Sequence, residues 1–73
     1  MSSAAAIGED VRVAGYALAG VEVHPAEDAN GCQEAFDRLP QDLACLILTP
    51  AARAALAARL LERPSLLWVE VPA

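Results

Sequence analysis

The sequence predicts a small α/β domain built on an open four-stranded parallel sheet with three crossover helices. Short apolar segments alternate with longer helical segments along the 73 residues, as in successive βαβ units. The segment Leu43 to Leu48 is apolar without alternation, which is typical of a strand covered on both faces. Residues that cap or end helices stand between these segments. A length of 73 residues is that of one small domain, so residues 1–73 are expected to form a single domain.

The first strand and the first helix are predicted before residue 20. Ala4 to Gly8 is a short apolar segment, predicted as a strand mainly because a helix and a second strand follow it. Val11 to Ala19 carries apolar residues at helical spacing, including Leu18. Gly15 costs such a helix about 1 kcal/mol relative to alanine, so we expect it to lie close to the sheet. Gly20 follows the helix end, where the left-handed backbone conformation favours glycine.

The second strand and the second helix are bounded by prolines and an acid. Val21 to His24 is predicted as a short strand that ends at Pro25. The second helix is predicted from Ala29 to about Leu39, with Asp28 as its N-cap, because an aspartate carboxylate accepts hydrogen bonds from the free amides of a first turn. Pro40 ends this helix.

The second half of the chain supplies the remaining strands and one more helix. Leu43 to Leu48 is the best candidate for the centre of the sheet. Thr49 followed by Pro50 is typical of a helix start, an N-cap hydroxyl and a proline at the first helical position. A single helix is predicted over Ala51 to Arg63, and the last strand over Leu66 to Val71.

One face of this sheet is expected to be only half covered. With the flavodoxin-like order 2-1-3-4, right-handed crossovers place the first helix alone on one face and the other two helices on the opposite face. No helix follows the last strand to lie beside the first. Alternation along the last strand leaves two possible sets of side chains on that face: Leu67, Val69 and Val71, or Leu66, Trp68 and Glu70. An apolar patch there is typical of an interaction surface.

Composition excludes several classes of protein. The net charge is −5 and all five basic residues are arginines, which argues against nucleic-acid binding. The longest apolar run has six residues, Leu43 to Leu48, and a membrane span needs about twenty. The start carries no basic segment of a secretory signal, so a cytoplasmic protein is expected. The sequence has one histidine and two cysteines without CxxC spacing. These are too few ligands to predict a metal site and too few cysteines to predict a disulfide framework.

No catalytic motif is found, so we expect a non-enzymatic protein without a cofactor. Gly8 stands alone, outside any glycine-rich phosphate loop. The acidic pair Glu9 and Asp10 invites comparison with receiver domains, which bind magnesium with acids after the first strand. Thr49 stands where a receiver needs its phosphoacceptor aspartate, and the chain has no lysine. Glu9 and Asp10 are better interpreted as a cap and a first-turn acid of the first helix.

Several segments resemble, in order, the F subunit of V/A-type rotary ATPases. The most recognisable is a glycine–aromatic element that ends in Leu-Ala-Gly-Val, and the last strand with its proline is the next. The segments that carry the resemblance are Ile7 to Asp10, Gly15 to Val21, Glu27-Asp28 with Glu34 to Phe36, Leu46 to Thr49, Pro64, and Trp68 to Pro72.

The resemblance implies a non-catalytic subunit of a central rotor stalk, peripheral to the membrane. Such a subunit clasps the coiled-coil D subunit and through it links ATP turnover in the A/B head to proton or sodium movement in the membrane ring. Family members continue past the position of Pro72 into a C-terminal helix, which this sequence lacks. The residues expected at the partner interface are Leu66, Trp68, Glu70, Arg59 and Arg63; Gly15, Leu18 and Gly20 are expected to be structural.

A stand-alone α/β interaction module, such as a degenerate receiver-like domain in signalling, is the alternative. It predicts the same fold and the same absence of catalytic motifs. Neighbouring reading frames would separate the two, because ATPase subunits are expected beside a rotor-stalk gene and signalling proteins beside the other. The isolated chain is expected to self-associate through the uncovered sheet face or to need a partner there, first of all the coiled-coil D subunit.

Overall fold

The computed structural model describes residues 3–9 and 20–72, and its centre is a four-stranded parallel sheet. The strands are β1 (Ala4–Gly8), β2 (Glu22–Pro25), β3 (Cys45–Leu48) and β4 (Leu67–Glu70). Their order is β2-β1-β3-β4, and all three neighbouring pairs are parallel. The predicted fold class and strand order are therefore confirmed. The ends of the strands differ from the predicted ones by no more than two residues.

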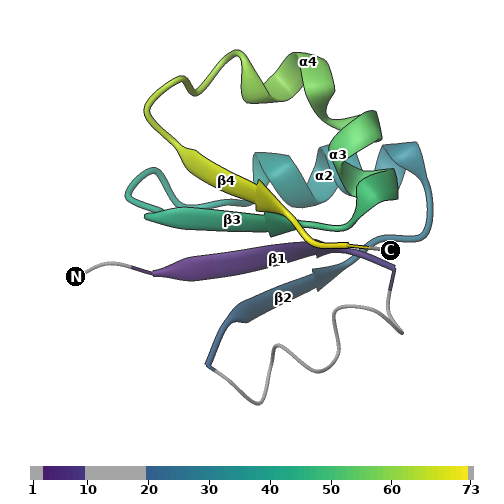
Figure 1. The fold of residues 1–73 in the computed structure, drawn as a ribbon, viewed down its shortest axis with the longest axis horizontal. Coiled ribbons are helices and arrows are strands. Elements are labelled where there is room, and N and C mark those ends of the chain that lie inside the picture. Colours follow the sequence, from purple (N-terminus) through teal and green to yellow (C-terminus); the bar gives the residue numbers. More distant parts are fainter. Residues whose placement is uncertain (1–2, 10–19, 73) are drawn as a thin grey trace.

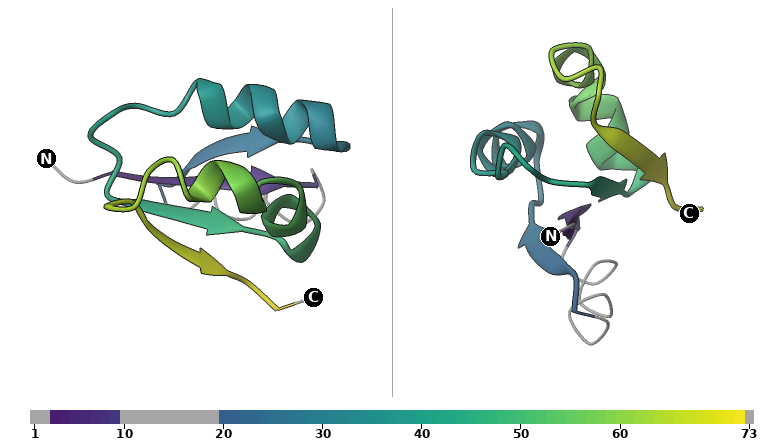
Figure 2. Two further views of the ribbon diagram at one scale, coloured as in Figure 1. Left: turned by 90° about the horizontal axis from the view of Figure 1, so that it is seen from above. Right: turned by 90° about the vertical axis from the view of Figure 1, so that its left-hand side faces the viewer.

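Three helices of the described chain cover one face of this sheet (Figure 1 and the right view of Figure 2). They are α2 (Ala29–Asp37), α3 (Pro50–Ala55) and α4 (Ala57–Leu60). The helix predicted over Val11 to Ala19, including Gly15 and Leu18, lies outside the described residues. None of the helices in the described ranges has the length and apolar character that a bilayer-spanning helix requires.

The single helix predicted over Ala51 to Arg63 is wrong in two respects, because the structure divides it at Leu56 and ends it at Leu60. Leu56 has φ −104° and ψ 8°, and it ends α3 and precedes α4. No proline or glycine stands there, so local propensity predicts an unbroken helix. The side chain of Leu56 is completely buried and Leu60 is also buried. We attribute the break to tertiary packing of these leucines against the sheet.

Both predicted N-caps are present. The Asp28 carboxylate accepts a hydrogen bond of 2.7 Å from the amide of Gly31 in the first turn of α2. The Thr49 hydroxyl accepts one of 3.4 Å from the amide of Ala52 in α3, and Pro50 occupies the first helical position. Gly20 has φ +83°, which confirms the left-handed conformation expected from its position.

The hydrophobic core lies between the sheet and these helices. Ile7 of β1 and Leu46 and Leu48 of β3 are fully buried there. The register pairs Leu46 with Trp68 and Leu48 with Glu70, so Trp68 and Glu70 lie on the helix-covered face. Leu67 and Val69 consequently lie on the opposite face, which resolves the alternative that the sequence left open.

Candidate functional site

The carboxyl ends of β1 and β3 meet at the point where ligands bind in many open α/β sheets. Glu9 follows β1 and Thr49 follows β3, and the Thr49 hydroxyl donates a hydrogen bond of 2.7 Å to the Glu9 carboxylate. Thr49 thus both caps α3 and contacts the acid after β1. The Glu9 carboxylate therefore has the Thr49 hydroxyl as a partner, and Asp10, the second acid of the pair, lies outside the described residues.

A cavity of about 160 Å³ lies beside Glu9 at this edge of the sheet. The polar groups that line it are acidic, namely Glu9, Glu27 and Asp28, together with the thiol of Cys32. Burial raises the pKa of the Cys32 thiol, and the nearby charges of Asp28 and Glu9 raise it further. In the described part of the chain, no three histidine, cysteine or acidic side chains are grouped so that they could hold a metal ion.

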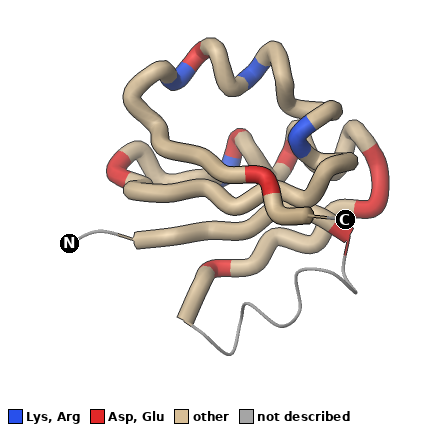
Figure 3. The backbone as a smooth tube through the Cα atoms, viewed as in Figure 1, with Lys and Arg blue, Asp and Glu red and all other residues tan. Residues whose placement is uncertain are grey.

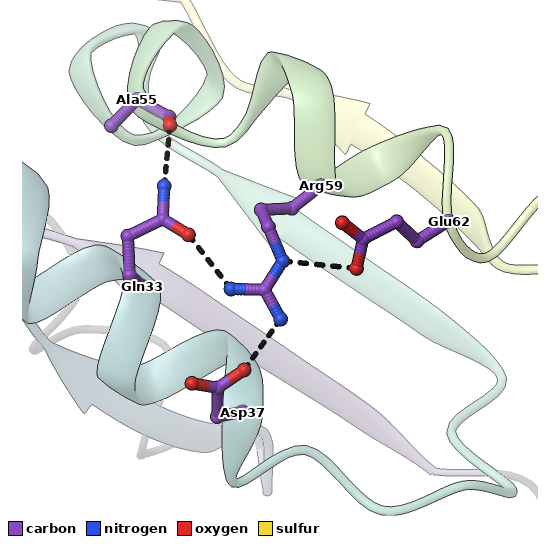
Figure 4. A network of polar contacts seen from close by, with 5 residues as sticks. All are labelled: Gln33, Asp37, Ala55, Arg59 and Glu62. Carbon is purple, nitrogen blue, oxygen red and sulfur yellow. Dashed lines mark hydrogen bonds and ion pairs between the residues drawn. The ribbon is translucent and has the colours of Figure 1, made fainter.

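Arg59 is the centre of a polar network that joins α4 to α2 (Figure 4). Its Nη1 donates to Gln33 at 2.7 Å, its Nη2 to Asp37 at 2.5 Å and its Nε to Glu62 at 3.1 Å. Gln33 in turn donates to the carbonyl of Ala55 at 2.9 Å. Hydrogen bonds to Asp37 and Glu62 hold the pKa of Arg59 above its usual range. All three guanidinium nitrogens of Arg59 are therefore used within the chain.

Arg63 also points back toward the chain. Its Nη2 donates to the carbonyls of Pro40 and Gln41, at 3.0 and 3.3 Å. The guanidinium groups of Arg59 and Arg63 lie 4.8 and 6.0 Å from the ring centre of Phe36, as in cation–π pairs. These arginines line a cavity of about 300 Å³ beside α2 and α4. The two arginines expected at the partner interface, Arg59 and Arg63, thus already have intramolecular partners.

The other three residues expected at the interface, Leu66 directly before β4 and Trp68 and Glu70 within it, also face the helices or the core. Leu66 is buried in the core, and Trp68 is partly buried against it. Arg53 of α3 lies 5.7 Å from the Trp68 ring centre. The same arginine pairs with Glu70 at 3.6 Å between Nε and Oε1. Arg53, which stands in α3, was not among the expected interface residues.

The opposite face of the sheet, here called the open face because its β4 side chains are exposed, is apolar, and its β1 residues Ala6 and Gly8 are buried. The register assigns nine strand residues to it, and none carries a charge: Val23, Pro25, Ala4, Ala6, Gly8, Cys45, Ile47, Leu67 and Val69. Leu67 is 63% exposed and Val69 45% exposed. The described arginines, by contrast, lie in α3 and α4 or within three residues after the ends of α2 and α4 (Figure 3). Alternation in the sequence predicted such a surface without deciding which set of β4 residues forms it.

Comparison of the chain with family models, with curated proteins and with solved structures found no match.

Proposed function

We propose that this chain is a non-catalytic protein-binding module that acts as the F-type subunit in the central stalk of a V/A-type rotary ATPase. In this role it binds the coiled-coil D subunit and turns with it. Through D it couples ATP turnover in the A/B head to proton or sodium transport in the membrane ring. The proposal rests on the sequence resemblance together with the chemistry of the open face.

The observation that carries the binding proposal is the exposed apolar strip on β4. Two large side chains of one four-residue strand, Leu67 and Val69, are 63% and 45% exposed. Ile47 of β3, which pairs with Val69, is half-buried beside them. Contiguous exposed apolar residues on so small a domain are typical of an interaction surface. A long helical partner with an apolar stripe matches an uncharged, flat strand surface.

The strand ends favour binding over catalysis. Thr49 occupies the position that follows the central strand, and its hydroxyl is bonded to Glu9 and to the first turn of α3. A hydroxyl with no histidine base beside it is a poor nucleophile. The one histidine of the sequence, His24, contacts Glu22 at 2.9 Å in the same strand. Neither arrangement supplies an activated nucleophile.

The test is complex formation between the full chain and the D subunit encoded in the same genome. The two purified proteins should co-elute at equal stoichiometry, and calorimetry should give the affinity. Val69→Lys should weaken binding by about tenfold or more, because a charge on the open face must be desolvated on contact. Leu61→Lys is the matched control, because Leu61 is 81% exposed but lies at the end of α4.

Failure of the wild-type chain to bind D at micromolar concentration would contradict the rotor-stalk proposal. If D binds but Leu61→Lys weakens it as much as Val69→Lys does, the complex forms without the open face. The first outcome rejects the assignment of the partner, and the second rejects only the assignment of the surface.

The alternative is a stand-alone interaction module of the degenerate receiver type. The observation in its favour is the strand order 2-1-3-4 with an acid, Glu9, directly after β1 and bonded to the residue after β3. This alternative predicts signalling proteins, and not ATPase subunits, in the neighbouring reading frames. It also predicts no complex with the D subunit.

A further inference from the structure

The outer edge of β4 exposes backbone hydrogen-bonding groups. β4 is the last strand of the described sheet, with β3 as its neighbour on the other side (left view of Figure 2). The amide of Val71 donates to the carbonyl of Leu48 in β3 at 2.9 Å. Because successive peptide units point to opposite sides of a strand, the amides and carbonyls of Trp68 and Glu70 point away from β3. Such an edge is a template for another strand.

This edge has no lysine or proline within the strand, although the strand has only four residues and carries Glu70. Proteins commonly protect an edge strand with lysine, with proline or with a charge on its exposed face. β4 has no lysine or proline within Leu67–Glu70, and its open-face residues Leu67 and Val69 are exposed and apolar. Pro72 follows the strand, which limits any pairing to this short segment.

The charges beside the edge are complementary to those of a second copy. Arg53 lies 5.7 Å from the ring centre of Trp68 and 3.6 Å from the carboxylate of Glu70. Both side chains of the ion pair are nearly half exposed. If Trp68 stands opposite Glu70 of another copy, each Arg53 lies near two carboxylates, its own and that of the other copy.

We propose that two copies of this chain pair through β4 in antiparallel orientation, with Trp68 opposite Glu70 of the other copy and Val69 opposite Val69. Residues paired across an antiparallel ladder share a face, so this register keeps Trp68 and Glu70 on the helix side. Leu67 then stands opposite Val71. The outward peptide groups of Trp68 and Glu70 form the hydrogen-bonded pairs, and the two Val69 residues form the closer, non-hydrogen-bonded pair.

Neighbouring registers are less favourable. Shifting the two strands by one pair in one direction places Glu70 opposite Glu70, and like charges directly opposite are destabilising. The opposite shift pairs Trp68 with Trp68 and moves Glu70 opposite Leu66, whose amide is already donated to Arg63. Of the three registers, the proposed one keeps the two Glu70 carboxylates apart and places each of them opposite the Trp68 that Arg53 of the other copy contacts.

The dimer is a continuous eight-stranded sheet with twofold symmetry. The open faces of the two copies join into one apolar surface of doubled width, because pairing at the edge leaves Leu67 and Val69 on that face. The inference does not depend on the rotor-stalk proposal. The hydrogen bonds of edge pairing use the outward backbone groups of Trp68 and Glu70. A helical partner on the open face would contact the side chains of Leu67 and Val69.

Cysteine cross-linking of the full chain tests both the pairing and its register. Val69→Cys should form a disulfide-linked dimer readily, because the two Val69 residues face each other in a close pair. Leu67→Cys is the matched control: the two copies of Leu67 are offset by four residues, about 13 Å, in the proposed register. The Val69→Cys dimer should form at least about tenfold faster. Both variants are made in a Cys45→Ser background, because the register pairs Cys45 with Leu67 in the same chain, and the Cys45→Ser chain gives the background rate.

Equal cross-linking of Val69→Cys and Leu67→Cys would overturn the register and indicate contact between open faces instead. Cross-linking of neither above the background rate would overturn the pairing itself.

Sedimentation equilibrium provides a test without cysteine variants. The wild-type chain should show the dimer mass, and Glu70→Arg should shift the equilibrium toward monomer because each copy then meets two like charges beside Arg53. The double variant Arg53→Glu, Glu70→Arg should restore the dimer, because it reverses both signs. Leu61→Lys should leave the equilibrium unchanged. A wild-type chain that stays monomeric at about 1 mM would overturn the proposal.

Discussion

At the scale of single residues, Gly8 and Thr49 show how closely β1 approaches the start of α3. A Cβ atom added at Gly8 would lie 2.2 Å from Cγ2 and 2.6 Å from Oγ1 of Thr49. Thr49 cannot easily move, because its hydroxyl is bonded both to Glu9 and to the amide of Ala52. The space beside Gly8 is therefore a requirement of the fold.

Gly8→Ala should lower the free energy of unfolding by about 1–3 kcal/mol, the usual cost of overpacking. Urea denaturation measures this cost. The double variant Gly8→Ala, Thr49→Ala should lose less than the sum of the two single variants, because removing Cγ2 and Oγ1 relieves the closest contacts. Strict additivity would show that the two residues do not compete for the same space.

The two cysteines should differ in reactivity. Cys32 is 4% exposed and its thiol pKa is raised by burial and by Asp28 and Glu9, so a smaller fraction is thiolate at pH 8. Cys45 lies on the open face and is partly exposed. Iodoacetamide at pH 8 should therefore label Cys45 first, as followed by peptide mass spectrometry. In guanidinium chloride the two rates should converge; equal rates in the native chain would contradict the burial of Cys32.

At the scale of elements, α4 is too short to be stable alone and depends on its contacts with α2. It has four residues, whereas isolated helices shorter than about 12 residues are marginal in water. The Arg59 network supplies three hydrogen bonds from one planar guanidinium to Gln33, Asp37 and Glu62. The same group stacks on Phe36.

Arg59→Lys should lower the melting temperature, because an ammonium group reproduces neither the planar arrangement of donors nor the stacking on Phe36. Arg38→Lys is the matched control, since among the described residues the Arg38 side chain pairs only with the exposed Glu34, at 3.8 Å. Circular dichroism melts of the two variants give the comparison. An equal effect of both substitutions would mean that the network contributes no more than a surface ion pair.

At the scale of the whole molecule, the two sides of the described sheet differ in charge. The described arginines accompany the helices, whereas the strand positions of the open face carry no charge. Acids at the strand ends surround a cavity of about 160 Å³. The molecule thus combines a charged helical side, an acidic strand end and an apolar sheet face.

We expect no saturable binding of ATP or Mg²⁺ by the full chain at micromolar concentration. The physical reason is the lack of a phosphate loop and of any lysine in the sequence, together with Thr49 at the position of a phosphoacceptor. Isothermal titration with each ligand is the measurement. A saturable heat that disappears in Glu9→Gln would instead assign a ligand to the acidic strand end.

Much of the architecture follows from local sequence signals. The caps at Asp28 and Thr49, the proline at position 50 and the unbroken apolar segment before it predicted α2, β3 and the start of α3. These signals act over one helical turn or along one strand, so they do not depend on tertiary context. The break of the helix at Leu56 was not predictable in this way, because the local sequence favours an unbroken helix and we attribute the break to tertiary packing of Leu56.

The sequence by itself determined the fold class and the existence of an apolar sheet face, because periodicity and capping are local properties and crossovers between parallel strands have one hand. The strand order 2-1-3-4 was expected as the flavodoxin-like arrangement, and the pairing of the strands confirms it. Only the tertiary structure decided which face each β4 residue occupies. Alternation defines two sets of side chains, but the pairing of Leu46 with Trp68 selects between them. The same pairing placed Trp68 and Glu70 beside Arg53 and left Leu67 and Val69 exposed, since a one-residue shift in register exchanges the two faces of a strand.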